Sequence, residues 1–240
     1  MSKIVYLDRE ANKNEFAQFL KSIGNPKKYY ENSLKLHIEC KKGQLFKSNT
    51  NEANKSHKMD TCVAANDIFY ATSVGMYIQK FQKVIDTDKS VIYLPVNPKK
   101  MYPDVNIFDG AKDVAIGVEM VHVTEAQALR ALYNGLFNIG KGESIMLENF
   151  NTENFYCPDE RVLRDDENGF YNFPDNLVFS GKNNREIQLT IDDSLAQLID
   201  GATDSKGVAR SFVNIIQFQF KGYRVPDAAE AFENWKKNNK

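Results

Sequence analysis

The chain has few of the residues that form disulfides, metal sites or membrane spans. Its 240 residues include only three cysteines and one tryptophan. Cys40, Cys62 and Cys157 lie far apart and form no Cys-x-x-Cys pair, which is more typical of a reducing interior than of a disulfide scaffold. No stretch approaches the roughly 20 apolar residues that a membrane helix needs, so we expect no transmembrane segment. The opening Met1–Leu7 also lacks the pattern of a secretory signal.

The charge balance limits the classes of partner. The chain has 31 basic and 32 acidic residues, which gives a formal net charge of -1. A protein that binds along many phosphates usually carries a clear basic surplus, so a dedicated nucleic-acid binder is disfavoured. Some lysines do gather in one stretch, where they form either a solvated loop or a local basic patch. They are Lys41, Lys42, Lys47, Lys55 and Lys58.

Common catalytic motifs are absent from the sequence. It contains no GxxxxGK(S/T) phosphate loop, no GxGxxG dinucleotide fingerprint and no GxSxG nucleophile elbow. A serine or cysteine nucleophile needs a base, and the available histidines are His37, His57 and His122. A catalytic triad dispersed along the chain is therefore the enzymatic alternative. The interpretation that we favour is that the chain is not an enzyme.

Binding motifs for metals, anions and rings are also sparse. Cysteine and histidine never occur at the short spacing that zinc requires, and we predict neither a metal site nor a cofactor. The Gly140–Gly142 stretch, Gly-Lys-Gly, either forms a turn or exposes backbone N–H groups to an anion. Tyr29–Tyr30, Phe170–Tyr171 and Tyr223 either stack on a sugar or base, or pack in a core and its interfaces.

Alternation of apolar and polar residues dominates the rest of the chain. Leu34, Leu36, Ile38 and Cys40 alternate with polar residues, which predicts a strand with one solvated face. Strands are expected at 5–7, 34–41, 63–70, 74–85, 91–96, 114–123, 170–173, 177–179, 186–191 and 216–225. Residues 48–58 are interpreted as an exposed loop, and 151–186 as a long surface excursion. Short strands between turn signals predict a mainly β sandwich or barrel rather than alternating βαβ units.

Helices are predicted near both ends of the chain. Phe16, Phe19, Leu20 and Ile23 form an apolar stripe on a helix at 10–23, which Gly24 and Pro26 end. A final amphipathic helix after Pro226-Asp227 carries Phe232 and Trp235. Short helices are also expected at 125–134 and 192–200, although an Asn-Gly hairpin at 134–135 competes with the first of these.

These elements predict three regions. An N-terminal helical arm occupies residues 1–30, a β-rich body residues 31–225, and a C-terminal helix residues 226–240. The body forms one barrel or two, and a boundary between two would fall near 97–113, where proline and glycine concentrate.

Two segments resemble the jelly-roll shell proteins of tailless bacteriophages. The strand Glu186–Ile191, the polar excursion Asp192–Gly207 and the strand Asn214–Val225 are similar to the last strands of those proteins. Leu136–Leu147 is similar to a strand pair within such barrels. The resemblance implies a jelly-roll-like β-sandwich, and a capsid or accessory shell subunit that assembles with copies of itself and with other virion proteins. It also implies a protein made in the host cytoplasm and located in the virion.

The resemblance gives the apolar faces of the two terminal helices a role. They would lock one subunit to the next, although packing on their own barrel is an equal alternative. The residues concerned are Phe16, Phe19, Leu20, Ile23, Phe232 and Trp235. A carbohydrate- or receptor-binding β-sandwich module is the alternative function, and it requires exposed aromatic side chains in a cleft.

Overall fold

The structure is a computed structural model that describes residues 9–25, 28–40, 45–85, 91–96, 111–116, 119–124, 131–141, 144–155, 170–191 and 212–238. Its α-helices are α1 (Arg9–Ser22) and α4 (Ala229–Asn238), and its 3-10 helices are η1 (Glu52–Asn54), η2 (Ala131–Asn134) and η3 (Thr152–Phe155). The strands are β1 (Tyr30–Glu39), β2 (Leu45–Asn49), β3 (Ile68–Ile85), β4 (Val91–Pro95), β5 (Ala111–Ile116), β6 (Glu119–Thr124), β7 (Leu136–Lys141), β8 (Ser144–Asn151), β9 (Phe170–Ser180), β10 (Glu186–Thr190) and β11 (Phe212–Val225). The described chain is therefore mainly β-structure, as the alternation predicted.

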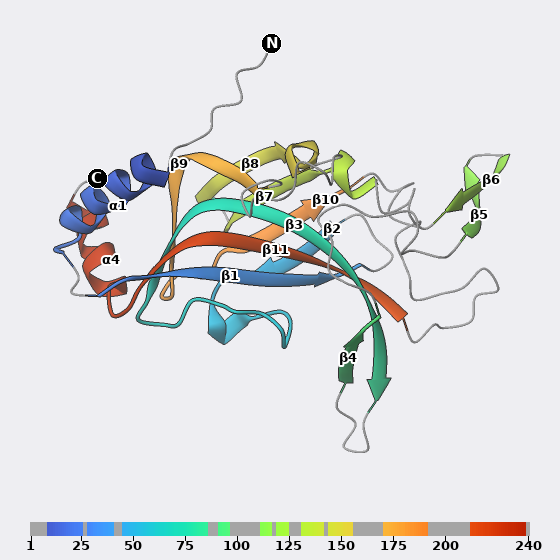
Figure 1. Ribbon diagram of the computed structural model, residues 1–240, viewed down its shortest axis with the longest axis horizontal. Coiled ribbons are helices and arrows are strands. Elements are labelled where there is room, and N and C mark those ends of the chain that lie inside the picture. Colours follow the sequence, from blue (N-terminus) through green and yellow to red (C-terminus); the bar gives the residue numbers. More distant parts are fainter. Residues whose placement is uncertain are drawn as a thin grey trace, which may run out of the picture.

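The strand pairs of the body are nested from the ends of the chain toward its middle (Figure 1). One sheet has the order β1-β11-β3, with β4 and β9 both paired to β3, and the other has the order β2-β10-β7-β8. Thus β1 pairs with β11, β2 with β10, β3 with β9 and β7 with β8, and every pair is antiparallel. β5 and β6 form a separate hairpin between β4 and β7 in the sequence.

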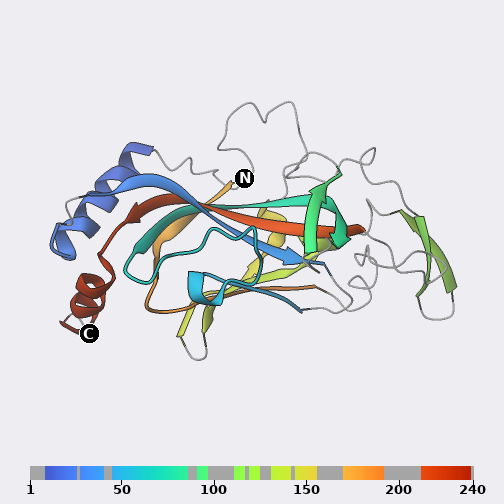
Figure 2. The same cartoon turned by 90° about the horizontal axis from the view of Figure 1, so that it is seen from below.

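The two sheets lie as two layers (Figure 2). Their apolar faces enclose one core. Leu36 of β1 and Phe218 of β11 face it from one sheet, and Phe137 of β7 and Leu189 of β10 face it from the other. All four side chains are fully buried, and the Phe137 and Phe218 ring centroids lie 4.7 Å apart across the core. The period-two patterns at 34–41, 186–191 and 216–225 are explained by this arrangement.

β9 corrects the prediction of a surface excursion at 151–186. It is one strand over 170–180 rather than two short ones, and Phe173, Leu177 and Phe179 are buried in the core. The gap between the two predicted strands, which contains Pro174, is a shift in register, because Ala71 of β3 pairs with Leu177 and Ser73 pairs with Asn172. A proline lacks the N–H of a regular ladder, so a bulge is where a strand tolerates it. η3 is a second exception to the predicted surface excursion, since its Phe155 is fully buried.

Four further expectations change at the level of single elements. The predicted segments 63–70 and 74–85 belong largely to one continuous strand, β3. The predicted run 114–123 is a hairpin of β5 and β6 rather than one strand. Part of the predicted loop 48–58 belongs to β2, and Ser48 and Thr50 are buried. At 131–134 the 3-10 helix η2 precedes β7, whose described partners are β8 and β10, so no Asn-Gly hairpin forms. The predicted elements at 5–7, 125–130 and 192–200, and most of the boundary at 97–113, lie outside the described residues.

The helix predicted at 10–23 is confirmed as α1, and its end has a defined geometry. The Asn25 N–H donates to the Leu20 carbonyl at 2.7 Å, and the Gly24 N–H donates to the Lys21 carbonyl at 3.3 Å. These two bonds form a Schellman motif around Gly24, whose φ is +90°. α1 and α4 then lie together at one end of the sandwich (Figure 1).

Gly222 confirms the bulge that the sequence predicted in the last strand. The register of β11 against β3 shifts between Lys221 and Gly222. A Cβ atom at Gly222 would lie 1.9 Å from the carbonyl oxygen of Tyr70, a backbone atom that cannot shift as easily as the end of a flexible side chain. Only glycine therefore allows β11 to approach β3 this closely.

We expect Gly222→Ala to lower the free energy of unfolding by about 3 kcal/mol, because the added methyl group overpacks the contact with β3. Gly24→Ala is the matched control, since a Cβ there meets no atom within 4 Å. The control carries only the strain of its left-handed backbone, about 1 kcal/mol. Urea unfolding of the two variants would measure both values, and equal losses would contradict a steric role for Gly222.

Candidate functional site

A polar cluster lies on the outer face of the first sheet, where β1 meets the segment 50–61. His37 belongs to the polar face of β1, which the alternation predicted to be solvated. Its side chain is instead only 7 % exposed, because residues 57–60 fold over it. On the neighbouring strand Gln217 is its direct cross-strand partner, with Oε1 of Gln217 3.1 Å from Nε2 of His37. The prediction of a wet face is therefore wrong at His37.

Asp60 joins this loop to the edge of β1. Its Oδ1 accepts the backbone N–H of His37 at 2.6 Å and lies 3.1 Å from the His37 Nδ1 atom. Its Oδ2 accepts the backbone N–H of His57 at 2.8 Å. The carboxylate is fully buried, and these donors compensate for the loss of water around it. Asp60 thereby fixes both the edge strand and the turn that carries His57.

His57 is the second buried histidine of the cluster. Its ring centroid lies 5.6 Å from that of His37 and 4.6 Å from that of Tyr93 on β4. Nδ1 accepts the backbone N–H of Met59 at 3.2 Å, whereas Nε2 is buried without a partner among the described residues. Burial lowers the pKa of His57 below 6.5, and the neighbouring His37 lowers it further, against the opposing effect of Asp60.

The arm formed by β4 and the end of β3 closes the other side of the cluster. Tyr93 of β4 donates its hydroxyl hydrogen to Oε1 of Glu39, and Lys83 of β3 lies 3.2 Å from Oε2 of the same carboxylate. Lys83 also lies 5.6 Å from the centroid of the Tyr93 ring, its cross-strand partner. Burial and the hydrogen bond to Glu39 raise the pKa of Tyr93, so its hydroxyl stays a donor at neutral pH.

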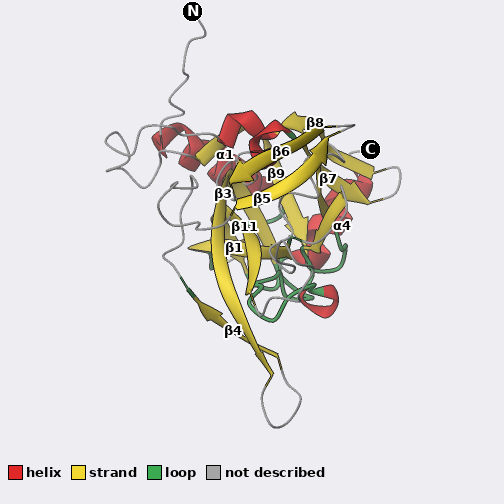
Figure 3. Ribbon diagram, turned by 90° about the vertical axis from the view of Figure 1, so that its right-hand side faces the viewer, coloured by secondary structure: helices red, strands yellow, loops and turns green. Residues whose placement is uncertain are grey.

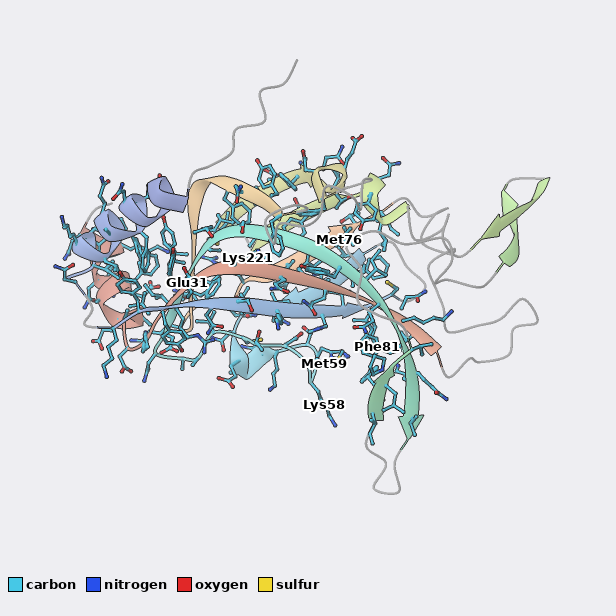
Figure 4. The ribbon with its side chains drawn as sticks, in the orientation of Figure 1. Glu31, Lys58, Met59, Met76, Phe81 and Lys221 are labelled. Carbon is cyan, nitrogen blue, oxygen red and sulfur yellow. The ribbon has the colours of Figure 1, made fainter. Side chains whose placement is uncertain are left out.

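A cavity of about 420 Å³ opens beside this cluster. It lies between β1, β2, β4 and the turn at 56–58, and polar and apolar side chains contribute comparably to its wall. Figure 4 shows Lys58 extending away from the sheet below Met59, on the side of the arm. The lining residues are His37, Ile38, Glu39, Leu45, Phe46, Lys47, Ser56, His57, Lys58, Val91 and Tyr93.

The chemistry available at this cavity is hydrogen bonding and charge. In the described structure, the nitrogen atoms of His37 and His57 contact no serine, threonine or cysteine side chain, so neither is placed to activate a nucleophile. No group of three or more histidine, cysteine, aspartate or glutamate residues within the described ranges is arranged to hold a metal ion.

Sequence reasoning found only part of this site. His37 and His57 were identified as possible bases, but nothing in the sequence joined them to each other. Glu39, Tyr93 and Gln217 were missed, because they reach the site through pairings of β1 with β11 and of β3 with β4 that are distant in the chain. Asp60 carried a weak local signal, since an aspartate three residues after His57 can accept its N–H in a turn.

The six residues predicted as assembly contacts form a second, apolar cluster where α1 and α4 pack on the end of β3 and β11. Phe16, Leu20, Ile23 and Phe232 are buried within the chain itself, at 2 to 6 % exposure. The Phe16 ring stacks on Tyr223 at 4.3 Å. Phe19 and Trp235 are only partly buried, so among the six these two retain surface that a neighbouring subunit can contact.

Most of the other predicted binding residues have structural roles in the fold. Tyr223 stacks on Phe16, Tyr171 lies 4.4 Å from Phe150, and Lys221 covers the ring of Phe170 at 4.1 Å. Tyr29 and Tyr30 remain exposed, at 53 and 48 %. None of these rings lines the cavity of about 420 Å³ beside His57.

The remaining predicted features fall on both described and undescribed residues. Cys40 and Cys62 are buried, and burial raises the pKa of the Cys62 thiol to about 12. Lys47, Lys55 and Lys58 are exposed. Gly140 and Lys141 belong to β7, whereas Lys41, Lys42, Gly142 and Cys157 lie outside the described residues, and so does the side chain of His122. No described helix is long and apolar enough to cross a membrane.

We expect acidification to weaken the fold through His57. In the unfolded chain this histidine binds a proton near pH 6.5, whereas burial disfavours the protonated form in the folded state. The unfolded state therefore binds more protons as the pH falls below about 6.5, and the free energy of unfolding decreases. His57→Phe removes this contribution. Urea unfolding between about pH 7 and 5 should give a shallower pH slope for the variant, because the carboxylates contribute equally to both proteins. Identical slopes would contradict the assignment.

The apolar cluster gives a prediction for α1. Phe16→Ala should lower the free energy of unfolding by about 4 kcal/mol, because it leaves a cavity among buried aromatic rings. Gln18→Ala on the same helix is the control, since its side chain is exposed and its loss should change stability by less than about 0.5 kcal/mol. Thermal or urea unfolding measures both, and a small effect of Phe16→Ala would mean that α1 is not docked on the sheet in solution.

No protein-family model, curated protein or solved structure matches the chain. The strand order, the exposed surfaces and the polar cavity are therefore the features that bear on its function.

Proposed function

We propose that this chain is a virion structural protein, a capsid or accessory shell subunit that acts by self-assembly rather than by catalysis. The observation that carries the proposal is the nested order of the strand pairs, with β1 on β11, β2 on β10, β3 on β9 and β7 on β8. An antiparallel hairpin of paired strands that is rolled into two packed sheets is the jelly-roll arrangement, which viral capsid domains share with lectins and cupins. β4, β5 and β6 are then an insertion in one connection of the roll.

A fold alone does not assign a function. Features of the surface are therefore needed to distinguish a capsid domain from a lectin or a cupin. The arm of β4 and the end of β3 extends from the sandwich (Figure 3). Along it Ile92, Leu94 and Val96 are 40, 47 and 51 % exposed. In the described sheet β4 pairs on one side only, with β3. An apolar edge strand of this kind readily pairs with another chain, and monomeric proteins usually protect such edges.

In the proposed shell, the partner of this arm is a second copy of the chain. The two terminal helices take a smaller part than the sequence predicted, through the partly exposed Phe19 and Trp235. Other virion proteins are further partners, and the virion is the proposed location. No cofactor is needed, because association would rest on apolar burial and backbone pairing.

The direct test is the mass of the purified native chain, measured by light scattering on a sizing column across concentration and salt. A shell subunit should form defined oligomers or particles, which negative-stain microscopy would show as closed or symmetric assemblies. A strict monomer at all concentrations would overturn the proposal.

A double substitution on the arm tests where the contact lies. Ile92→Lys with Leu94→Lys should reduce the assembled fraction at least about tenfold, because it places two charges at an apolar contact. The secondary structure should stay unchanged by circular dichroism, since both side chains are exposed. Ile145→Lys on β8 is the control, because Ile145 is 54 % exposed on the other sheet. Loss of assembly by the control alone would place the contact away from the arm.

The polar cavity favours a second candidate, a carbohydrate- or receptor-binding module of the same fold. Its size is in the range of small-molecule sites, and it combines the Tyr93 and His57 rings with charged groups. A monomeric protein that binds a glycan in a screen would favour this candidate over the shell subunit.

A further inference from the structure

We propose that the cavity beside β4 binds a small organic carboxylate, which accepts a hydrogen bond from Nε2 of His57. This inference does not depend on self-assembly, because every group that it uses belongs to one copy of the chain. It rests on an unsatisfied donor, on the pairing of the local carboxylates and on the shape of the wall.

The tautomer of His57 follows from its backbone contact. Nδ1 accepts the N–H of Met59 at 3.2 Å, so it carries no hydrogen. The proton of the neutral ring is then on Nε2, which makes this atom a donor. Nε2 is buried and has no acceptor among the described residues. Buried donors are nearly always satisfied in folded proteins, and His57 belongs to the wall of the cavity, so an acceptor that enters the cavity from outside the described chain is expected here.

The carboxylates that line or adjoin the cavity are not that acceptor, because neither Asp60 nor Glu39 lies within hydrogen-bond distance of Nε2. Asp60 accepts from the backbone of His37 and His57. Glu39 accepts from the Tyr93 hydroxyl on one oxygen and from Lys83 on the other. Lys83 pairs with Glu39, so Asp60 is the carboxylate whose charge opposes the entry of an anion, and its hydrogen bonds to backbone N–H groups lessen this effect.

The lysine side chains of the cavity are less completely paired than its carboxylates. Lys47 forms an exposed ion pair with Glu186 at 3.1 Å. Lys58 is exposed and forms no ion pair with any described residue. A ligand with one negative charge would therefore find a neutral imidazole donor inside and an ammonium group at the entrance. Charge-assisted hydrogen bonds of this kind favour a carboxylate over a neutral acceptor.

The wall of the cavity indicates the size and polarity of the part of the ligand that carries the carboxylate. Leu45 and Val91 are 46 and 36 % exposed, and with Phe46 they present apolar surface next to the polar groups. A volume of about 420 Å³ holds a molecule of one or two rings. The ligand class is therefore a ring-sized organic acid, whose ring is either an apolar aromatic or a sugar.

The experiment uses the full chain labelled with ¹⁵N and four probes. Benzoate and D-glucuronate carry the carboxylate on an aromatic and a sugar ring, and benzamide and glucose are their neutral counterparts. We expect one acid to shift the imidazole Nε2 signal of His57 and the backbone signals of Lys58 and Val91 in a saturable way. Its neutral counterpart should bind at least about tenfold more weakly. The acid that binds shows whether the ring of the ligand is an aromatic ring or a sugar.

Two variants make the assignment specific. Lys58→Ala should weaken the binding of the acid about fivefold, as expected for a charge at a solvated rim. Lys182→Ala, which removes an exposed lysine outside the cavity, should leave the binding unchanged. His57→Phe keeps a ring against Tyr93 and should weaken binding about tenfold or more. The unshifted part of the spectrum shows whether each variant is folded.

Three results would overturn the proposal. They are no saturable shift at His57 with either acid, equal binding of an acid and its neutral counterpart, and equal effects of Lys58→Ala and Lys182→Ala. Failure of this test would leave the shell proposal untouched, because particle mass and ligand shifts are independent measurements.

Discussion

The antiparallel contact between β3 and β11 is the constraint on which the rest of the structure depends. β11 lies between β1 and β3, and its pairing with β3 extends from Phe212 to Val225. Its inward side chains fill the core, while Gly222 lets it pass close to Tyr70. β1 and β11 come from opposite ends of the chain, so this sheet closes only after most of the sequence is available. Contacts of such sequence separation make folding slow, and they also make the closed body cooperative.

The polar cluster is a consequence of leaving β1 at the edge of that sheet. An edge strand has backbone N–H groups without a ladder partner, and these groups need another acceptor. Asp60 supplies it at His37, and the bridge between Lys35 and Thr61 continues the protection along the edge. Because the same segment carries His57 over the face of the sheet, protection of the edge and formation of the cavity share one structural cause.

The periodic parts of the sequence predicted the fold well, and the departures have physical reasons. Phe16, Leu20 and Ile23 predicted α1, because a helix that packs on a sheet needs one apolar face. Pro174 made β9 look like two short strands, because a proline normally interrupts a strand. β9 continues past it through a shift in register against β3. His37 was assigned to solvent because period two reports which face a residue occupies, but not what later covers that face. Only part of the site could be predicted, because strand pairing brings together residues that are distant in the sequence. Gln217, for example, lies 180 positions beyond His37.

The arm of β3 and β4 connects the two proposals physically. Tyr93 faces the cavity, where it contacts His57 and Glu39, while its neighbours Ile92 and Leu94 expose their side chains on the opposite face of the same strand. Successive residues of a strand point to opposite faces, so a rigid shift of β4 moves both surfaces together. A second copy bound to the apolar face would hold Tyr93 in place, and an occupied cavity would hold the apolar face in place. Assembly and ligand binding, where both occur, are therefore expected to strengthen each other through the position of one strand.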